Sequence, residues 1–512
     1  MLGIGPRTGG GAASVLARVA ALAASVAALL TPVGCLPVPD VKVPLLVQPP
    51  AYRVAPERVQ RETFWIDTPS APSTPSEFDR TGVRRTYLPE VAPRVIIVAM
   101  PGLFGGATTF DPWARQLVAS EPSIQVWAID RRANALEDRE GILRAMAADD
   151  PEVARDYYAR GGGFSPIDPA EVAFMAHWGL QVHLRDLQQV VLRASEEAEA
   201  VMLAGHSLGA GIISVYAAAR IRPDQGGGFG EDYIEGLILL DGSVGRTGSF
   251  GWADERVAAL GVTLVPSVDD LESGRVAPYL RTWIGLGPER YVRYAVAATY
   301  AQLRPCDLAP PGSAPYPVTN RALAGIRADD DYALTPVFSV SVGEAVGARF
   351  AGNLTAFILT GTEAARSRTV AGVAEGASHV TWSAGDPSRE VSDLDEIVAS
   401  WTDPDADMAE WYFPLRLAVD LAALDPRLLN TPGFAPMEGV DVATLAIGAG
   451  RGLIDSPVGF QSYVNTRPGA PIAVTVVPGL THLDILKARA NPTLPIVLRW
   501  LRSEGWLPPR PR

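Results

Sequence analysis

Short runs of aliphatic and β-branched residues alternate with helical patterns along most of the chain. Most of these runs are apolar almost without interruption, as in strands that are buried on both faces of a sheet. The pattern predicts eight strands, at residues 63–68, 83–88, 94–100, 124–129, 200–204, 234–240, 444–447 and 472–477. We expect the first two to be leading antiparallel strands. The others predict a mostly parallel sheet with helices on both faces, an α/β fold.

This rhythm stops between the sixth and seventh predicted strands. The intervening residues are rich in Trp, Tyr and Pro and are broken by Gly. We interpret residues 245–440 as a cap or lid inserted into a core that comprises residues 63–244 and 441–512. The aromatic side chains of this segment either line a substrate pocket or pack the cap itself.

The amino-terminal residues differ from the rest of the chain. Arg7 and Arg18 precede an apolar run at residues 19–30, a pattern typical of a signal peptide at residues 1–34. Because the run is shorter than the roughly 20 residues that cross a bilayer, we expect its removal. Cys35 follows a small residue, as at a bacterial lipoprotein cleavage site, and we expect it to be lipidated. The alternatives are cleavage by an ordinary signal peptidase and an uncut anchor.

Composition restricts the compartment and the partners. Residues 36–76 contain nine prolines, so we interpret residues 35–62 as an extended tether. Cys306 is the other cysteine, so lipidation of Cys35 would leave no intrachain disulfide. A net charge of −13 repels phosphate backbones and argues against a nucleic-acid partner. We therefore expect an exported protein, either secreted or attached to the cell envelope through Cys35.

The strongest local motif is Gly-His-Ser-Leu-Gly at residues 205–209, between a predicted strand and the apolar helical stretch 212–221. A serine at such a strand-to-helix turn has a strained backbone, and Gly205 and Gly209 remove side chains that would collide there. The turn would expose the Ser207 hydroxyl. The start of the following helix would offer the N–H of Leu208 to a negatively charged oxygen.

With this motif at the fifth strand and acid and base candidates downstream, the sequence resembles the α/β-hydrolase superfamily from about residue 94 onwards. The resemblance implies a nucleophile, an acid and a base in the chain order Ser, Asp, His. It also implies an eight-stranded sheet, and it does not cover the predicted cap between the sixth and seventh strands. Ser207 is then the nucleophile, and an imidazole must take its proton.

Five histidines compete for the role of base. His177 and His183 lie upstream of Ser207, and His206 adjoins it inside the turn, where packing is its expected role. His482 follows the last predicted strand, where the superfamily places its base. We therefore predict His482 as the base, with His379, in the predicted cap, as the reserve candidate.

The acid that orients the base has two candidates. Relatives usually take it from the loop after the seventh strand, where Asp455 is the acid, although it lies later than the usual position, which Arg451 and Gly452 occupy. Other relatives take it from the end of the sixth strand, where Asp241 lies. We favour Asp455 and keep Asp241 as the alternative.

The loop after the third strand, residues 101–106, should supply a second oxyanion donor. Leu103 is the first candidate and Phe104 the second. Asp130, Arg131 and Arg132 follow the fourth strand, and we interpret them as residues that pin loops through ion pairs. The sequence has no metal-ligand spacing and no nucleotide-binding fingerprint, so we expect neither a metal nor another cofactor.

These features predict a serine hydrolase that cleaves small-molecule carboxylic esters through an acyl-enzyme, similar to esterases and lipases. Two alternatives stay open. An acyltransferase would use the same three residues with an alcohol in place of water. A ligand-binding lipoprotein would have the same fold without catalysis.

Overall fold

The computed structural model describes residues 51–160, 162–220, 228–243, 257–259, 262–265, 267–281, 287–333, 339–352, 368–423 and 439–509. The predicted signal peptide and Cys35 lie outside these residues. Part of the predicted tether is bound to the folded core, because the N–H groups of Arg53 and Val54 donate to the Ala119 carbonyl. The first strand also begins earlier than expected, at Gln60.

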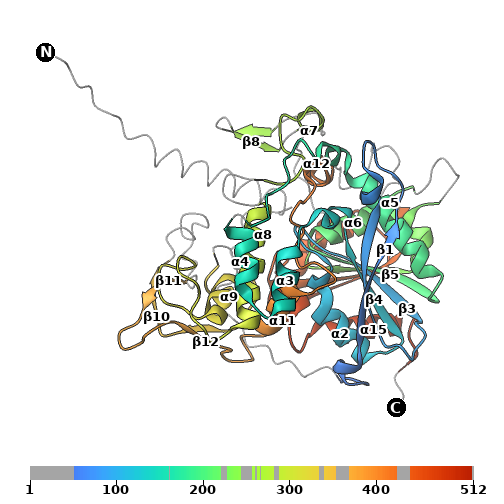
Figure 1. The fold of residues 1–512 in the computed structure, drawn as a ribbon. Coiled ribbons are helices and arrows are strands. Elements are labelled where there is room, and N and C mark those ends of the chain that lie inside the picture. Colours follow the sequence, from blue (N-terminus) through green and yellow to red (C-terminus); the bar gives the residue numbers. More distant parts are fainter. Residues whose placement is uncertain are drawn as a thin grey trace.

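An eight-stranded sheet forms the centre of the molecule (Figure 1). Its order is β1-β2-β4-β3-β5-β6-β13-β14, and all eight predicted strands are present. Pairing is antiparallel between β1 and β2 and between β2 and β4, and parallel across the rest of the sheet. The strands are β1 (Gln60–Asp67), β2 (Arg80–Tyr87), β3 (Val95–Met100), β4 (Ile124–Asp130), β5 (Ala200–His206), β6 (Gly236–Leu240), β13 (Ala443–Arg451) and β14 (Ile472–Thr481).

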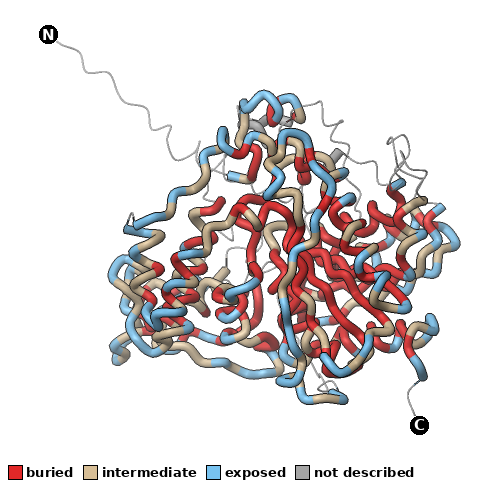
Figure 2. The backbone as a smooth tube through the Cα atoms, turned by 45° about the vertical axis from the view of Figure 1, so that its right-hand side comes forward, coloured by how far each residue is buried: buried red, intermediate tan, exposed pale blue. Residues whose placement is uncertain are grey.

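The central strands are apolar throughout because both of their faces are covered. Every residue of β3 is buried, and its side chains alternate between two hydrophobic clusters. One cluster includes helices α5 (Leu180–Ser195) and α6 (Leu208–Ala218). The other includes α2 (Asp111–Ser120), α14 (Asp484–Lys487) and α15 (Thr493–Ser503). Figure 2 shows this buried centre with exposed backbone around it.

A long segment separates β6 from β13 in the sequence, but the two strands are neighbours in the sheet, where Leu239 pairs with Ala446. We call residues 244–442 the inserted segment. Whether it works as a lid stays a prediction. Its described elements are β7 (Val257–Ala259), β8 (Val262–Val265), α7 (Val268–Glu272), α8 (Pro288–Leu303), α9 (Asn320–Ala328), β9 (Glu344–Val346), β10 (Ala348–Gly352), β11 (Arg368–Val373), β12 (Thr381–Ser383), α11 (Leu394–Thr402) and α12 (Leu415–Ala423).

Helices from two parts of the chain lie together beside the sheet. Helix α8 packs against α9 and α11 and also against α3 (Glu140–Ala148) and α4 (Pro151–Ala159), which follow β4 (Figure 1). Apolar side chains of α8 and α11 share a small core of their own. Among the described helices, none is long and apolar enough to span a membrane.

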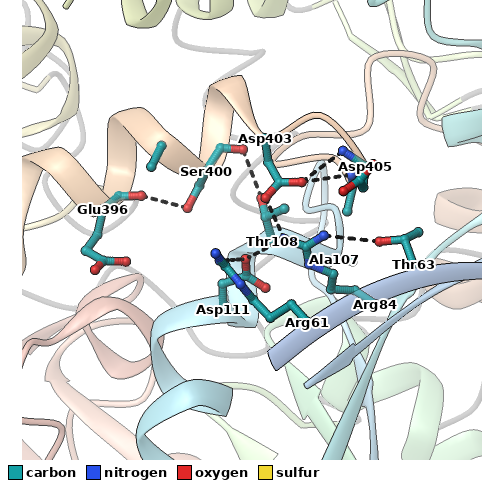
Figure 3. Close-up of polar contacts among 12 residues, drawn as sticks. Arg61, Thr63, Arg84, Ala107, Thr108, Asp111, Glu396, Ser400, Asp403 and Asp405 are labelled. Atoms are coloured by element: carbon teal, nitrogen blue, oxygen red, sulfur yellow. Dashed lines mark hydrogen bonds and ion pairs between the residues drawn. The ribbon is translucent and has the colours of Figure 1, made fainter. Parts of the chain in front are cut away.

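Buried polar contacts join the inserted segment to the sheet (Figure 3). Arg84 on β2 pairs with Asp111 at the start of α2, at 3.4 Å, and with Asp403 just after α11, at 2.5 Å. Nearby, the Thr108 hydroxyl donates to the Ser400 carbonyl at 3.1 Å. Thr108 belongs to the short helix η3 (Ala107–Phe110), which follows the loop after β3. The inserted segment therefore contacts the short helix that directly follows the predicted oxyanion loop.

Candidate active site

Ser207 lies at the turn between β5 and α6, in the strained backbone conformation that the motif predicts. Its φ is 55° and its ψ is −122°, a backbone conformation that residues other than glycine rarely adopt. The Ser207 N–H donates to the Leu240 carbonyl at 3.0 Å, which fixes the turn to the end of β6. Leu208 is the first residue of the helix that starts there. Ser207 thus lies at the positive end of a helix dipole.

Glycines surround this turn because the backbone leaves no space for side chains. A Cβ on Gly205 would lie 2.5 Å from the Ala210 nitrogen, and one on Gly209 would lie 2.1 Å from the Met100 carbonyl oxygen. A Cβ on Gly102, in the loop after β3, would lie 2.9 Å from the Ser207 Cβ. The loop that was predicted to carry the second oxyanion donor therefore touches Ser207.

His482 and Asp241 form a buried pair at the same edge of the sheet. His482 directly follows β14, and its Nδ1 donates to the Asp241 Oδ2 at 2.6 Å. Asp241 directly follows β6 and is fully buried, and His482 is 2% exposed. Because β5, β6 and β14 run parallel, their carboxyl ends bring Ser207, Asp241 and His482 to one edge.

Backbone amides complete the surroundings of the Asp241 carboxylate. The Ala449 and Ile454 N–H groups donate to Oδ1 at 3.0 and 2.9 Å, and the Leu453 N–H donates to Oδ2 at 2.8 Å. Burial alone would raise the pKa of Asp241, but the His482 hydrogen bond and charge and these amides outweigh it and lower the pKa. Asp241 is therefore a stable anion beside the imidazole.

The preference for Asp455 as the partner of His482 is corrected by this geometry. The loop after β13 contributes backbone N–H groups, and Asp455 is a half-buried residue beyond them. A Cβ on Gly452 would lie 2.1 Å from the Asp241 Oδ2. The usual acid position thus has to be a glycine, because the Asp241 carboxylate occupies that space. In the sequence, the glycine at position 452 was the one indication that the acid comes from another strand.

His206, interpreted as a packing residue, holds the backbone of His482. Its Nε2 donates to the His482 carbonyl at 2.8 Å, and the two rings lie 4.3 Å apart. Burial and the nearby His482 lower the pKa of His206 to about 3, so it stays neutral at physiological pH. The residue before Ser207 therefore contacts the predicted base directly.

Asp484 braces the turn that carries His482, a role that sequence reasoning missed. This fully buried carboxylate accepts from the N–H and hydroxyl of Ser341, both at 2.9 Å, and from the Ser392 hydroxyl at 2.6 Å. It also accepts from the Thr481 N–H at 3.1 Å. Since Ser341 and Ser392 belong to the inserted segment, Asp484 joins this segment to the residue preceding His482.

The remaining candidates lie elsewhere. His379 lies between β11 and β12, and its Nδ1 bonds the neighbouring Ser378 hydroxyl at 2.8 Å. Among the described residues, Asp329, Asp330 and Asp331 are the group whose carboxylates lie close enough to share a metal ion. Arg451 already forms an ion pair with Asp330.

Comparisons with known proteins place this chain only distantly. No protein-family model matches the sequence, and no curated protein matches it. Among solved structures, a candidate lipase from Sulfolobus solfataricus has a TM-score of 0.46 and 15% identity, over 90% of this chain and 98% of its own. A monoglyceride lipase from Saccharomyces cerevisiae, bound to a substrate analogue, has a TM-score of 0.37 and 10% identity, over 89% and 98%. An esterase from Thermogutta terrifontis has a TM-score of 0.34 and 12% identity, over 86% and 99%.

The topology of this chain itself defines its fold. Two leading antiparallel pairings precede a parallel sheet, and the strained turn at Ser207 joins β5 to the helix that follows it. The predicted base follows the last strand of the sheet. These features are those of the α/β-hydrolase fold.

Proposed function

We propose that this protein is a serine hydrolase that cleaves carboxylic esters through an acyl-enzyme. The observation that carries the proposal is the buried His482–Asp241 pair at the sheet edge where Ser207 occupies its strained turn. A carboxylate on Nδ1 fixes the tautomer and ring orientation of His482 and leaves its Nε2 to act as a general base.

In the proposed mechanism, the Ser207 Oγ attacks the ester carbonyl carbon while the His482 Nε2 takes the hydroxyl proton. Asp241 stabilises the imidazolium through the Nδ1 hydrogen bond. The N–H groups of Leu208 and Leu103 hold the carbonyl oxygen as it becomes an anion. The tetrahedral intermediate then expels the alcohol, which receives the proton from Nε2. Water repeats these steps on the acyl-enzyme and releases the acid.

The substrate expected at this site is an ester with an apolar acyl group. Leu103, Phe104, Leu208 and Leu453 are partly buried and pack against one core cluster; Leu208 follows Ser207 in the chain, and the Leu453 N–H donates to Asp241. Apolar side chains around a few placed polar groups are typical of sites for small apolar ligands. A series of p-nitrophenyl esters of increasing chain length tests this expectation.

A fluorophosphonate probe tests the nucleophile. We expect rapid covalent labelling of the wild type and none of Ser207→Ala, with ester hydrolysis lowered about 10⁴-fold or more in the variant. A folded wild type that neither labels nor hydrolyses esters would instead support a ligand-binding protein. Product analysis with added alcohols separates hydrolysis from acyl transfer.

We also propose that the protein is exported and attached to a membrane through a lipid on Cys35. The signal-peptide pattern at residues 1–34 supports this proposal. Metabolic labelling with a radioactive fatty acid should mark the wild type and not Cys35→Ala. A wild type that carries no label and is found in the medium would indicate simple secretion.

A further inference from the structure

Arg131, at the end of β4, contacts the loop after β3 along most of its length. Its Nη1 donates to the Pro101 carbonyl at 2.8 Å, and its Nη2 donates to the carbonyls of Gly102 and Gly105 at 2.9 and 3.2 Å. The side chain is 2% exposed. One guanidinium thus binds three carbonyls of a loop of six residues, 101–106.

Glu410, from the inserted segment, supplies the counter-charge. Its carboxylate accepts from the Arg131 Nε at 3.2 and 3.1 Å and from Nη2 at 2.5 Å, and it is fully buried. Its own N–H donates to the Phe104 carbonyl at 3.0 Å, and the Gly106 N–H donates to the Met408 carbonyl at 3.1 Å. The loop is therefore held from β4 on one side and from residues 408–410 on the other.

A buried ion pair of this kind is weak evidence for a stabilising role. Taking both charges out of water costs several kcal/mol, and well-packed apolar residues are often as stable in their place. The carbonyl acceptors suggest a different use. A planar arginine fixes several acceptors in defined directions, which a lysine ammonium does not.

The orientation of the peptide unit between Gly102 and Leu103 decides where the Leu103 N–H points. The Gly102 carbonyl and the Leu103 N–H belong to the same trans peptide unit, so they point in opposite directions. When the Arg131 Nη2 binds the Gly102 carbonyl, the Leu103 N–H has to point away from Arg131. Gly102 itself touches Ser207, where a developing oxyanion would lie.

We propose that Arg131, paired with Glu410, is a positioning residue that aims the Leu103 N–H at the oxyanion. The proposal rests on the proposed ester hydrolysis and adds a function for an ion pair in which neither partner reaches the substrate. A mispositioned donor lowers the stability of the transition state more than that of the bound ester, so kcat should fall while KM stays nearly constant.

The test compares Arg131→Lys with Arg132→Lys. Arg132 is an equally buried neighbour, bonded to Asp186, Asp79 and Thr68 and not to the loop. We expect both variants to lose melting temperature. We expect only Arg131→Lys to lose kcat, by about 10²-fold, with KM within about threefold of the wild type. Its affinity for an arylboronic acid, which forms a tetrahedral adduct with serine, should fall by a similar factor.

A second variant covers the case in which Arg131→Lys does not fold. The double variant Arg131→Met, Glu410→Leu replaces the ion pair by apolar side chains of similar size, a change that is often tolerated. We expect a folded protein with kcat lowered about 10²-fold. Full kcat and full boronate affinity in a folded Arg131 variant would overturn the inference. A folded wild type without hydrolysis or boronate binding would instead overturn the proposed function.

Discussion

At the scale of single residues, the orientation of His482 depends on which acid holds it. Asp241 and Asp455 were both candidates because relatives take their acid from either strand end, and the sequence does not show which carboxylate faces the imidazole. The deciding facts are three-dimensional: the loop after β13 turns its amides towards Asp241, and Gly452 leaves the space that its carboxylate fills.

Asp241→Asn should abolish most of the activity. The amide cannot accept the Nδ1 hydrogen bond as an anion does, so it favours the wrong tautomer of His482. We expect kcat to fall by about 10³ to 10⁴-fold. Asp455→Asn is the matched control and should stay within about twofold of the wild type. Steady-state kinetics on a p-nitrophenyl ester measures both, and a severe loss in Asp455→Asn alone would contradict the assignment.

The contacts of Arg131 also lie beyond what the sequence shows. The prediction that Asp130, Arg131 and Arg132 pin loops through ion pairs is confirmed for the two arginines by the Glu410 and Asp186 pairs. The Asp130 carboxylate instead accepts from the backbone N–H groups of Ala107 and Asp407. Every residue has a backbone carbonyl, however, so the sequence does not show which carbonyls an arginine binds. Nothing in it therefore distinguished Arg131, which holds residues 101–105, from Arg132.

At the scale of elements, the apolar pattern located all eight strands of the sheet, with most boundaries within a few residues. Strands buried on both faces must be apolar throughout, so their pattern depends little on tertiary contacts. The two glycines of α6 differ in their surroundings. Gly209, predicted to prevent a collision at the turn, lies against the backbone at the end of β3, whereas Gly211 has space around it.

Alanine substitutions should separate these two glycines. A Cβ at position 209 would lie 2.1 Å from the Met100 carbonyl oxygen, whereas one at position 211 has 3.7 Å to its nearest neighbour, the Ser243 carbonyl oxygen. Gly209→Ala should disrupt the turn between β5 and α6 and inactivate the protein. Gly211→Ala should be neutral or raise stability by about 0.5–1 kcal/mol, because alanine favours helix. Urea denaturation compares the two, and equal effects would contradict the packing described.

At the scale of the whole molecule, buried titratable groups make stability depend on pH. Burial and the nearby charge of Asp407 raise the pKa of Asp130 to about 8, and burial with the same neighbour raises the pKa of Glu137 well above its ordinary range. Burial lowers the pKa values of His183 and His206 to about 3. Below pH 6.5, the ordinary histidine pKa, these histidines take up protons in the unfolded state but stay neutral in the folded state. In that range, raising the pH therefore stabilises the fold.

Between pH 6.5 and about 8, Asp130 and Glu137 lower the stability, and Lys487, whose pKa burial lowers to about 8, opposes them only near the upper end of this interval. In this window the unfolded carboxyls are ionised while folded Asp130 keeps its proton, so the folded state binds more protons and loses stability as the pH rises. Urea denaturation at pH 6.5 and 8 should show this loss. Glu137→Gln should reduce it, because the amide keeps an acceptor for the Trp411 N–H and removes one carboxylate that faces Asp407. A wild type that gains stability over this interval would contradict the prediction.

The hydrogen bond between Asp241 and His482 spans 241 positions of the chain, and the strand before His482 is the edge strand β14, which neighbours β13. Proteins are synthesised from the amino end, and early parts can fold while later parts are still being made. A nascent chain therefore carries Ser207 and Asp241 long before it has its imidazole. If the protein is the proposed hydrolase, the unfinished polypeptide should be inactive until its final strand has been made and has docked against β13.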